Sequence, residues 1–366
     1  MLKAGIVGLP NVGKSSLFNA LTAQGAPSEN YPFCTVEPNV GTVEVPDARL
    51  DRVFELSGAA ERIPTVVQFV DIAGLVEGAS EGEGLGNRFL GNIREVDAIV
   101  HVLRCFEDPD ITHVSGGVDP VRDRDVVNTE LAMADLDAVE RRLDRVRKKA
   151  RTGEADAVKE LAVVTRLHEA LSEGRPARGV EVSREERGLI RDLQLLTAKP
   201  VLYMANTGED DLPSGENGHV EALRRALAEE EPEAGLVIVC SAIESELAEL
   251  DREERQAFLE DLGLEEPGLH RLIRATYDLL GLITFFTAGE KEARAWTVRR
   301  GARAPEAAGA IHSDFERGFI RAETVGYDDF VRVGSLKAAR DEGVMRSEGK
   351  EYTVADGDIM LFRFNV

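Results

Sequence analysis

Residues 8–15 have the sequence Gly-Leu-Pro-Asn-Val-Gly-Lys-Ser, which fits the phosphate-binding pattern G-x-x-x-x-G-K-[ST]. Gly8 and Gly13 permit a tight turn that points backbone N–H groups at anionic oxygens, and the N-terminus of a following helix adds a partial positive charge. Lys14 can reach the β- and γ-phosphates of a nucleotide, and the Ser15 hydroxyl can hold Mg²⁺. The apolar run before the loop predicts a buried strand, and residues 16–21 predict a helix, so the motif has the context that it needs.

Two further segments supply groups that can sense a bound triphosphate. Thr35 can close over Mg²⁺ and the γ-phosphate. Asp71 follows the apolar run 66–70 and can hold the Mg²⁺ shell, while the backbone N–H of Gly74 can meet the γ-phosphate. The predicted magnesium ligands are Ser15, Thr35 and Asp71.

The group that activates water is not obvious from the sequence. Leu75 stands where Ras-like proteins carry the glutamine that orients the attacking water, so hydrolysis must be slow or another group must position the water. His113 is a candidate general base or water-positioning residue, and an exposed loop histidine without a catalytic role is the alternative. Asn11 is a candidate ligand for K⁺, which would supply positive charge. The predicted catalytic groups are Lys14, Gly74 and His113.

The predicted base-recognition segment departs from the guanine-specific pattern. Residues 206–209 are Asn-Thr-Gly-Glu, where guanine-specific P-loop proteins have Asn-Lys-x-Asp. The lysine that would pack over the base is absent, and Glu209 replaces the aspartate that accepts two hydrogens from guanine. Adenine presents an N6 donor beside an N7 acceptor, which the amide of Asn206 can match, so the residues favour adenine. A degenerate guanine site is the alternative. The backbone amides of Ser241 and Ala242, after a later strand, are also predicted to line the base pocket.

Composition excludes several classes of protein. The chain has 366 residues, 43% of them hydrophobic, and a formal net charge of −23. The length allows two or three domains, and the charge argues against a surface coated with basic groups for nucleic acid. No segment approaches the ~18 to 20 apolar residues of a membrane span, and the first strand begins too early to leave room for a secretory leader. Three separated cysteines without metal-ligand spacing indicate reduced thiols. We expect a cytoplasmic monomer with no membrane partner.

Short apolar runs separated by helical patterns predict an α/β protein with a parallel sheet covered on both faces. We predict a P-loop NTPase domain over residues 1–120 and 199–280, interrupted by an insertion over 121–198. Residues 281–364 alternate short strands with glycine-rich turns, which indicates a β-rich α+β domain. The strands expected there are 283–287, 295–298, 352–354 and 359–362.

The insertion has the pattern of a helical hairpin. Apolar residues recur at steps of 4 and 3 over 132–150 and again over 157–171, which is the spacing of a coiled-coil seam. His168 falls on the second seam and is expected to pack or to lie at its rim. The first helix ends in a basic cluster that suits RNA phosphates, and complementing the helix dipole is the alternative. That cluster is Arg141, Arg142, Arg145, Arg147, Lys148, Lys149 and Arg151.

Taken together, these motifs resemble the YchF/Obg-like ATPase family over nearly the whole chain. The matching segments are 8–16, 30–39, 71–76 and 206–209, and residues 312–322 resemble the ubiquitin-like TGS domain of that family. A loop histidine that matches His113 has been considered catalytic in the family. The resemblance also implies that Ser15 and Thr35 face Mg²⁺ and that Thr207 lies against the base. The residues that it implies for phosphate binding are Asn11, Val12, Gly13, Lys14, Ser15 and Ser16.

The resemblance implies a ribosome-associated ATPase that binds ATP in preference to GTP and hydrolyses it slowly to ADP and phosphate. It also implies contact with the large or small ribosomal subunit and its rRNA, through the helical insertion and the TGS domain. Two alternatives stay open: an Obg-type GTPase, and a nucleotide-gated ribosome- or RNA-binding scaffold with negligible turnover.

Overall fold

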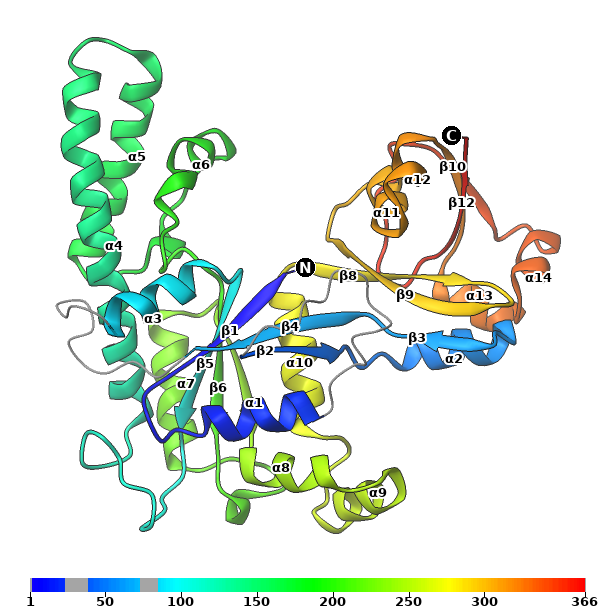
Figure 1. Ribbon diagram of the computed structural model, residues 1–366, viewed down its shortest axis with the longest axis horizontal. Coiled ribbons are helices and arrows are strands. Elements are labelled where there is room, and N and C mark those ends of the chain that lie inside the picture. Colours follow the sequence, from blue (N-terminus) through cyan, green and yellow to red (C-terminus); the bar gives the residue numbers. More distant parts are fainter. Residues whose placement is uncertain (1, 24–38, 73–84, 366) are drawn as a thin grey trace. The chain divides into compact units, whose positions relative to one another are not determined.

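The computed structural model describes residues 2–23, 39–72 and 85–365, so Thr35, Gly74 and Leu75 lie outside the described residues. The chain divides into two compact units (Figure 1). The first comprises residues 1–41 and 68–272, and the second comprises 42–67 and 273–366. The sequence assigned 42–67 to the nucleotide domain, whereas the packing of these residues joins them to the second unit.

The sheet of the first unit has six strands in the order β2-β4-β1-β5-β6-β7. Strand β1 pairs in parallel with both β4 and β5, and β6 pairs in parallel with both β5 and β7. Every side chain of β5 and β6 is buried, as expected for parallel strands covered on both faces. The strands are β1 (Lys3–Val7), β2 (Val40–Glu44), β4 (Val66–Asp71), β5 (Ala98–Arg104), β6 (Val201–Asn206) and β7 (Gly235–Val239).

Because β1, β4, β5, β6 and β7 are parallel, the loops that leave their carboxyl ends meet along one edge of the sheet. The loop after β1, Asp71 at the end of β4 and Asn206 at the end of β6 therefore come together. Within the described residues, no helix combines the length and the apolar character needed to cross a bilayer. The α-helices of the first unit outside the insertion are α1 (Lys14–Ala23), α3 (Leu85–Arg94), α7 (Gly218–Glu230), α8 (Ser241–Glu249) and α9 (Arg252–Asp261). Helix α10 (Gly268–Leu279) begins in this unit and continues past its boundary at residue 272.

The insertion contains the two helices that the heptad spacing predicted. Helix α4 (Pro120–Ala150) begins at the N-cap Asp119, whose carboxylate accepts hydrogen bonds from the N–H groups of Val121 and Arg122. Helix α5 (Ala155–Ser172) runs back along it (Figure 1). His168 lies at the rim, with its Nε2 3.5 Å from a Glu140 carboxylate oxygen. The buried residues that pack together here are Ala132, Val139, Leu143, Val163, Val164, Leu167, Leu171, Ala177 and Leu195.

The rest of the insertion folds back against the helix pair instead of forming a simple return loop. It contains α6 (Arg184–Ile190) and the short 3-10 helices η2 (Ala177–Gly179) and η3 (Arg191–Leu193). The Asp135 side chain, buried on α4, anchors this segment. Its carboxylate accepts hydrogen bonds from the backbone N–H groups of Leu196 and Thr197, both at 2.8 Å, and from the Thr197 hydroxyl.

Replacing Asp135 with alanine is expected to lower the free energy of unfolding by about 2–4 kcal/mol, because two buried N–H groups lose their acceptor. Urea unfolding followed by circular dichroism measures the change. The matched control is Asp137→Ala, since Asp137 is exposed on the same helix. Equal stability of the two variants would show that the anchor contributes nothing.

The second unit is built on a mixed six-stranded sheet in the order β11-β10-β12-β8-β9-β3. Its β8–β9 and β10–β12 pairs are antiparallel, whereas β3 joins β9 and β12 joins β8 in parallel. The strands are β3 (Glu61–Ile63), β8 (Leu282–Ala288), β9 (Glu292–Arg299), β10 (Phe319–Val325), β11 (Arg346–Glu348) and β12 (Ile359–Phe364). The helices are α2 (Ala48–Ser57), α11 (Ala304–Ile311), α12 (Ser313–Arg317), α13 (Tyr327–Val333) and α14 (Leu336–Asp341).

Three details of this unit differ from the sequence expectation. Residues 352–354 do not form a strand, and only an isolated bridge joins Thr353 to Arg303. Strand β10 was not predicted. Helix α2 packs with β8 and β9 residues in one apolar cluster, in which Leu50 and Val53 contact the group that includes Phe286. This cluster is the physical reason that residues 42–67 belong to the second unit.

Candidate nucleotide site

The loop between β1 and α1 has the backbone of a phosphate cradle. Gly8 and Gly13 have φ angles of 154° and 98°, and Asn11 between them has a φ of 61°, in the left-handed region. A Cβ atom on Gly8 would lie 2.5 Å from the Val102 carbonyl oxygen, and one on Gly13 would lie 2.2 Å from the Asn206 amide nitrogen. Only glycine fits these two positions, because a side chain would collide with fixed polar groups.

Lys14 is the first residue of α1, and its side chain is buried to 8% exposure. Its ammonium group donates a hydrogen bond to the Leu9 carbonyl at 2.5 Å. Burial lowers the pKa of Lys14 to about 8, although the charge of Asp71 acts in the opposite direction. A cation held in such a place is stabilised by an added anion, as a phosphate-binding lysine requires.

Asn206 ties the phosphate loop to the loop after β7. Its amide nitrogen donates to the Val12 carbonyl at 2.9 Å, and its amide oxygen accepts from the Ser241 backbone N–H at 2.9 Å. The two-point recognition of adenine that the sequence suggested needs this oxygen to accept from N6, so the arrangement does not support that role. The second N–H of the amide can still donate to N7, which adenine and guanine share.

A cavity of about 640 Å³ adjoins these groups. It is bordered by the phosphate loop, by the segment after β5, by residues 206–210 and by residues 240–242. The hydroxyl oxygens of Thr207 and Ser241 are buried and have no hydrogen-bond partner within the described residues, so both can bind a ligand or a water. Val12 alone among the predicted nucleotide-binding residues does not line the cavity. Those that do are Asn11, Gly13, Lys14, Ser15, Ser16, Asn206, Thr207, Glu209, Ser241 and Ala242.

Phe106 also lines the cavity, and the sequence analysis missed it. The buried Arg104 guanidinium lies over its ring, 4.6 Å from the centroid. Arg104 donates to the carbonyls of Phe106, Asp108 and Ile111, which fixes the course of this loop. The ring is therefore held rigidly at the wall of the cavity, where a purine can stack on it. An aromatic residue just after a predicted strand is the signal that could have identified it.

Replacing Phe106 with alanine is expected to weaken nucleotide binding by about fivefold to 100-fold, because base–aromatic stacking contributes about 1–3 kcal/mol. Fluorescence titration with a labelled nucleotide measures the affinity. Phe106→Tyr keeps the ring and is expected to bind within about twofold of the wild type. A Phe106→Ala protein with unchanged affinity would show that the base lies elsewhere.

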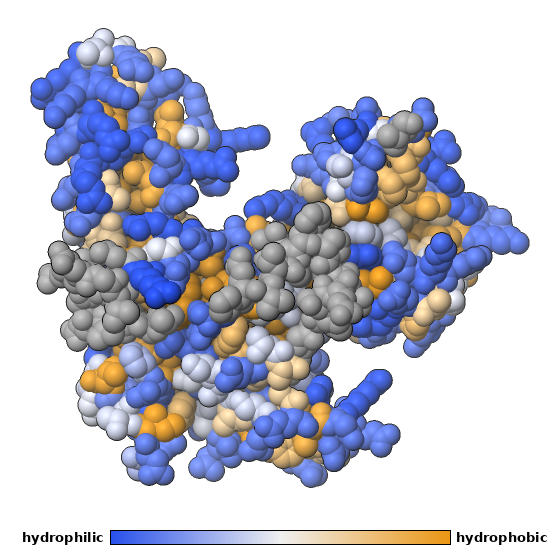
Figure 2. Space-filling view, in the orientation of Figure 1, coloured by the Kyte–Doolittle hydropathy of each residue, from blue (hydrophilic) through white to orange (hydrophobic). Residues whose placement is uncertain are grey.

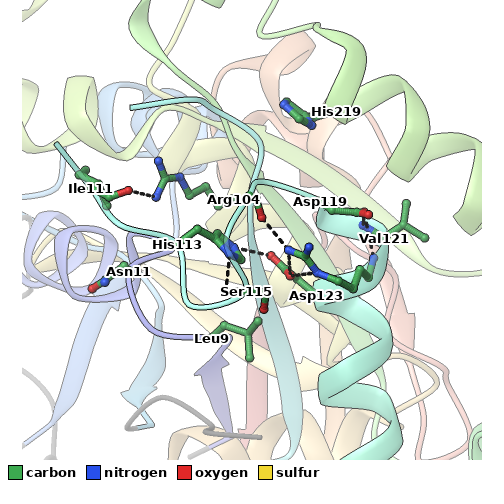
Figure 3. A network of polar contacts seen from close by, with 12 residues as sticks. Leu9, Asn11, Arg104, Ile111, His113, Ser115, Asp119, Val121, Asp123 and His219 are labelled. Atoms are coloured by element: carbon green, nitrogen blue, oxygen red, sulfur yellow. Dashed lines mark hydrogen bonds and ion pairs between the residues drawn. The ribbon is translucent and has the colours of Figure 1, made fainter. Parts of the chain in front are cut away.

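His113 is not the exposed or free imidazole that the sequence allowed (Figure 3). It is 8% exposed, its Nε2 lies 2.8 Å from an Asp123 carboxylate oxygen, and its Nδ1 accepts from the Ser115 N–H. The Nε2 contact therefore holds the loop against the first turn of α4, and the Nδ1 contact fixes the loop's own turn. In this arrangement neither nitrogen is available to take a proton from water, so a catalytic role for His113 requires the loop to rearrange.

The donors available for Mg²⁺ fit the preference of that ion for oxygen ligands. Ser15 is exposed beside the cavity, and Asp71 lies at the end of β4 in register with Ile6, next to the loop. Burial raises the pKa of Asp71, while the nearby Lys14 charge lowers it. Thr35 and Gly74, the other predicted contributors at the γ-phosphate, fall outside the described residues. Ser15 and Asp71 would hold the ion.

The first unit combines a sheet of mainly parallel strands, the glycine-containing loop after β1, the buried Lys14, and Asn206 bonded to that loop. These features define it as a P-loop NTPase domain. Residues 3–145 match a family described as "50S ribosome-binding GTPase", and residues 282–365 match one described as "Protein of unknown function (DUF933)".

The chain is 56% identical to a Bacillus subtilis protein named "Ribosome-binding ATPase YchF", and the alignment covers 100% of both chains. It is 54% identical to the protein of that name from Escherichia coli O157:H7, over 100% of this chain and 99% of the other. A solved structure described as "Structure of the Schizosaccharomyces pombe YchF GTPase" aligns with a TM-score of 0.89 and 39% identity, over 99% of this chain and 97% of that one. This chain belongs to the YchF family.

Proposed function

We propose that this protein is a ribosome-binding ATPase that prefers ATP to GTP and hydrolyses it slowly. The names of the bacterial relatives support the ATPase and ribosome-binding parts, whereas the Schizosaccharomyces pombe relative is named a GTPase. The single observation that carries the base preference is the Asn-Thr-Gly-Glu segment at the cavity. It lacks the lysine and aspartate of a guanine site, and Phe106 offers a stacking surface instead.

In the proposed reaction, water attacks the γ-phosphate in line with the bond to the leaving ADP oxygen. Lys14 would neutralise charge on the transferred group, and Mg²⁺ held by Ser15 and Asp71 would supply further positive charge there. Leu75, at the position of the water-orienting glutamine in Ras-like proteins, supports a slow intrinsic rate. A K⁺ ion near Asn11 belongs to the proposal as well. Its test is a comparison of turnover in K⁺ and Na⁺, and equal rates would remove K⁺ from the mechanism.

Competition binding between ATP and GTP tests the base preference. Unlabelled ATP is expected to displace a labelled ATP analogue at a lower concentration than GTP does. Guanine nucleotide binding tenfold tighter than ATP would favour the Obg-type GTPase instead. Absence of turnover, even with ribosomes added, would favour a nucleotide-gated scaffold.

The end of the helix pair is the proposed ribosome contact, and Figure 2 shows that its surface is largely hydrophilic. Arg142 does not contribute, because it pairs with Glu160 and Asp192 inside the insertion, and Arg147 lies 3.9 Å from Asp144. The remaining cations form what we call the basic tip, and all are exposed, with no ion pair to another described residue. The basic tip comprises Arg141, Arg145, Lys148, Lys149 and Arg151.

The second unit is proposed as a further ribosome contact. Cosedimentation with ribosomes tests the contribution of the basic tip. Arg145→Glu with Lys148→Glu is expected to weaken binding and to reduce its salt dependence, because fewer phosphate contacts release fewer counterions. The matched control is Arg224→Glu with Arg225→Glu, which reverses two exposed charges on α7. An equal loss of ribosome binding in both double variants would show that binding depends on the net charge of the protein and not on the basic tip.

A further inference from the structure

A second, much smaller cavity lies directly behind the candidate base pocket. Thr207 and Cys240 line both spaces, so they form the partition between them. The far wall of the small cavity includes Gly215, Glu244 and Gly268. Its volume is about 10 Å³, which is the lower limit for holding one water molecule.

Two buried polar atoms on the walls of this cavity have no hydrogen-bond partner within the described residues: Thr207 Oγ1 and Glu244 Oε2. Thr207 and Glu244 are only 3% and 2% exposed. The other carboxylate oxygen of Glu244 accepts from the Gly268 N–H, the first residue of α10, at 2.6 Å. Buried polar atoms are almost always paired with protein or water, so one water between these two atoms would satisfy both.

The surroundings of Glu244 leave its ionisation finely balanced. The backbone N–H groups of Gly268 and Leu269 favour the charged form of Glu244, and the charges of Arg271 and Arg255 favour it less strongly. Both guanidinium groups also donate to backbone carbonyls, those of Ile238, Leu247 and Leu250. Cys240 is the N-cap residue of α8, the helix that carries Glu244. Helix α1 packs against α8, and its Lys14 donates to the Leu9 carbonyl. Burial is the largest influence and raises the pKa of Glu244 to about 7.

We propose that Glu244 and Thr207, joined through one water in the small cavity, form a proton-controlled selector of the purine base. The proposal rests on the proposed function, since it requires a purine nucleotide in the cavity that Thr207 lines. Thr207 borders both cavities, so its hydroxyl group would transmit a change in the protonation of Glu244 to the bound base. Glu244 does not contact the base and is therefore a positioning residue.

The proposed direction of the effect assumes that the water passes the donor or acceptor state of Glu244 on to Thr207. An ionised Glu244 accepts from the water, and the water then accepts from the Thr207 hydroxyl. The threonine oxygen is left as an acceptor toward the pocket, which suits the N6 amino group of adenine. A protonated Glu244 donates to the water, the water donates to Thr207, and the hydroxyl proton is free to donate to O6 of guanine. The negative charge of ionised Glu244 acts in the same direction, because it attracts an amino group and repels a carbonyl oxygen.

The test is the ratio of ATP to GTP affinity, measured by calorimetry with non-hydrolysable analogues on the full chain between pH 6 and pH 8. The ratio is used because titration of the phosphates and of Lys14 affects both nucleotides equally. In the wild type we expect the ratio to rise about fivefold or more across this range. Glu244→Gln, which mimics the protonated carboxyl, is expected to stay at the low-pH ratio at every pH. Thr207→Val is expected to remove the pH dependence as well.

Glu246→Gln is the matched control, because Glu246 is exposed on the same helix, and it should behave as the wild type. A constant ratio in the wild type, or a rise that persists in Glu244→Gln, overturns the selector. GTP binding more tightly at every pH, with the rise retained, would instead overturn the proposed ATP preference and leave the selector standing.

A second measurement covers the case in which the variants do not fold. Carbon-13 NMR of the wild-type Glu244 carboxyl group should give a lower titration midpoint with ATP analogue bound than with GTP analogue bound, because the coupling is reciprocal. Equal midpoints in the two complexes would overturn the proposal.

Discussion

Replacing Lys14 with alanine is expected to reduce nucleotide hydrolysis by about 10³-fold or more, because the charge that faces the transferred phosphoryl group is removed. The side chain is buried beside the phosphate loop, so solvent cannot replace it. Phosphate release under single-turnover conditions measures the effect without interference from product release. Lys14→Arg keeps the charge, but its larger, planar head must fit a place that is 8% exposed, so it is expected to recover little activity. A rate unchanged by Lys14→Ala would mean that the measured activity comes from a contaminant.

The pH dependence of binding gives a second view of the same residue. The pKa of Lys14 is lowered to about 8 in the ligand-free protein, so the ammonium loses its proton above that pH. Phosphates bind the protonated form, and nucleotide affinity should therefore fall by up to about tenfold per pH unit above pH 8. This fall should be absent in Lys14→Ala.

Replacing Gly13 with alanine is expected to weaken nucleotide binding by about 100-fold or more, because backbone strain and a collision act together. The φ angle of 98° is unfavourable for any L side chain, and the new Cβ would lie 2.2 Å from the Asn206 amide nitrogen. Asn206 would have to give up its bond to the Val12 carbonyl, which ties the cradle to β6. Equilibrium titration with a labelled nucleotide measures the loss.

The matched control for Gly13→Ala is Gly91→Ala. Gly91 lies within α3, and a Cβ there would meet nothing within 4 Å. Alanine is the better helix former, so this control should bind normally and gain about 1 kcal/mol in stability. Tight nucleotide binding by Gly13→Ala would show that the loop can relax around the added methyl group.

The backbone turn at residues 8–15 could be predicted from the sequence, because its glycines lie in one continuous segment with fixed spacing. The positions of Lys14, Ser15 and the two glycines follow from that segment alone. The role of Asn206 did not follow, because its partners are the Val12 carbonyl and the Ser241 N–H, which are distant in the chain. Phe106 carries a local signal, an aromatic residue just after a strand, but the cavity that it lines is formed with segments far away in the chain.

For the organisation of the chain as well, features set by local spacing could be predicted, whereas features set by contacts between distant residues could not. The heptad spacing of α4 and α5 is a local pattern, and both helices are present. The assignment of residues 42–67 depends on Leu50 and Val53 packing with residues more than two hundred positions later, such as Phe286. No short-range pattern reports that contact. The burial of His113 against Asp123 also depends on the fold, since a loop histidine in sequence gives no sign of its partner.

The contacts around His113 join the phosphate cradle to the root of the longest helix. Asn11 donates to the Thr112 carbonyl at 3.1 Å, and the neighbouring His113 is bonded to Asp123 in the first turns of α4. That helix has 31 residues and is therefore about 46 Å long. A rigid rod of this length magnifies movement: pivoting it by about 5° at the root displaces the far end by about 4 Å. A tilt at this root therefore moves the basic tip farther than any other part of α4.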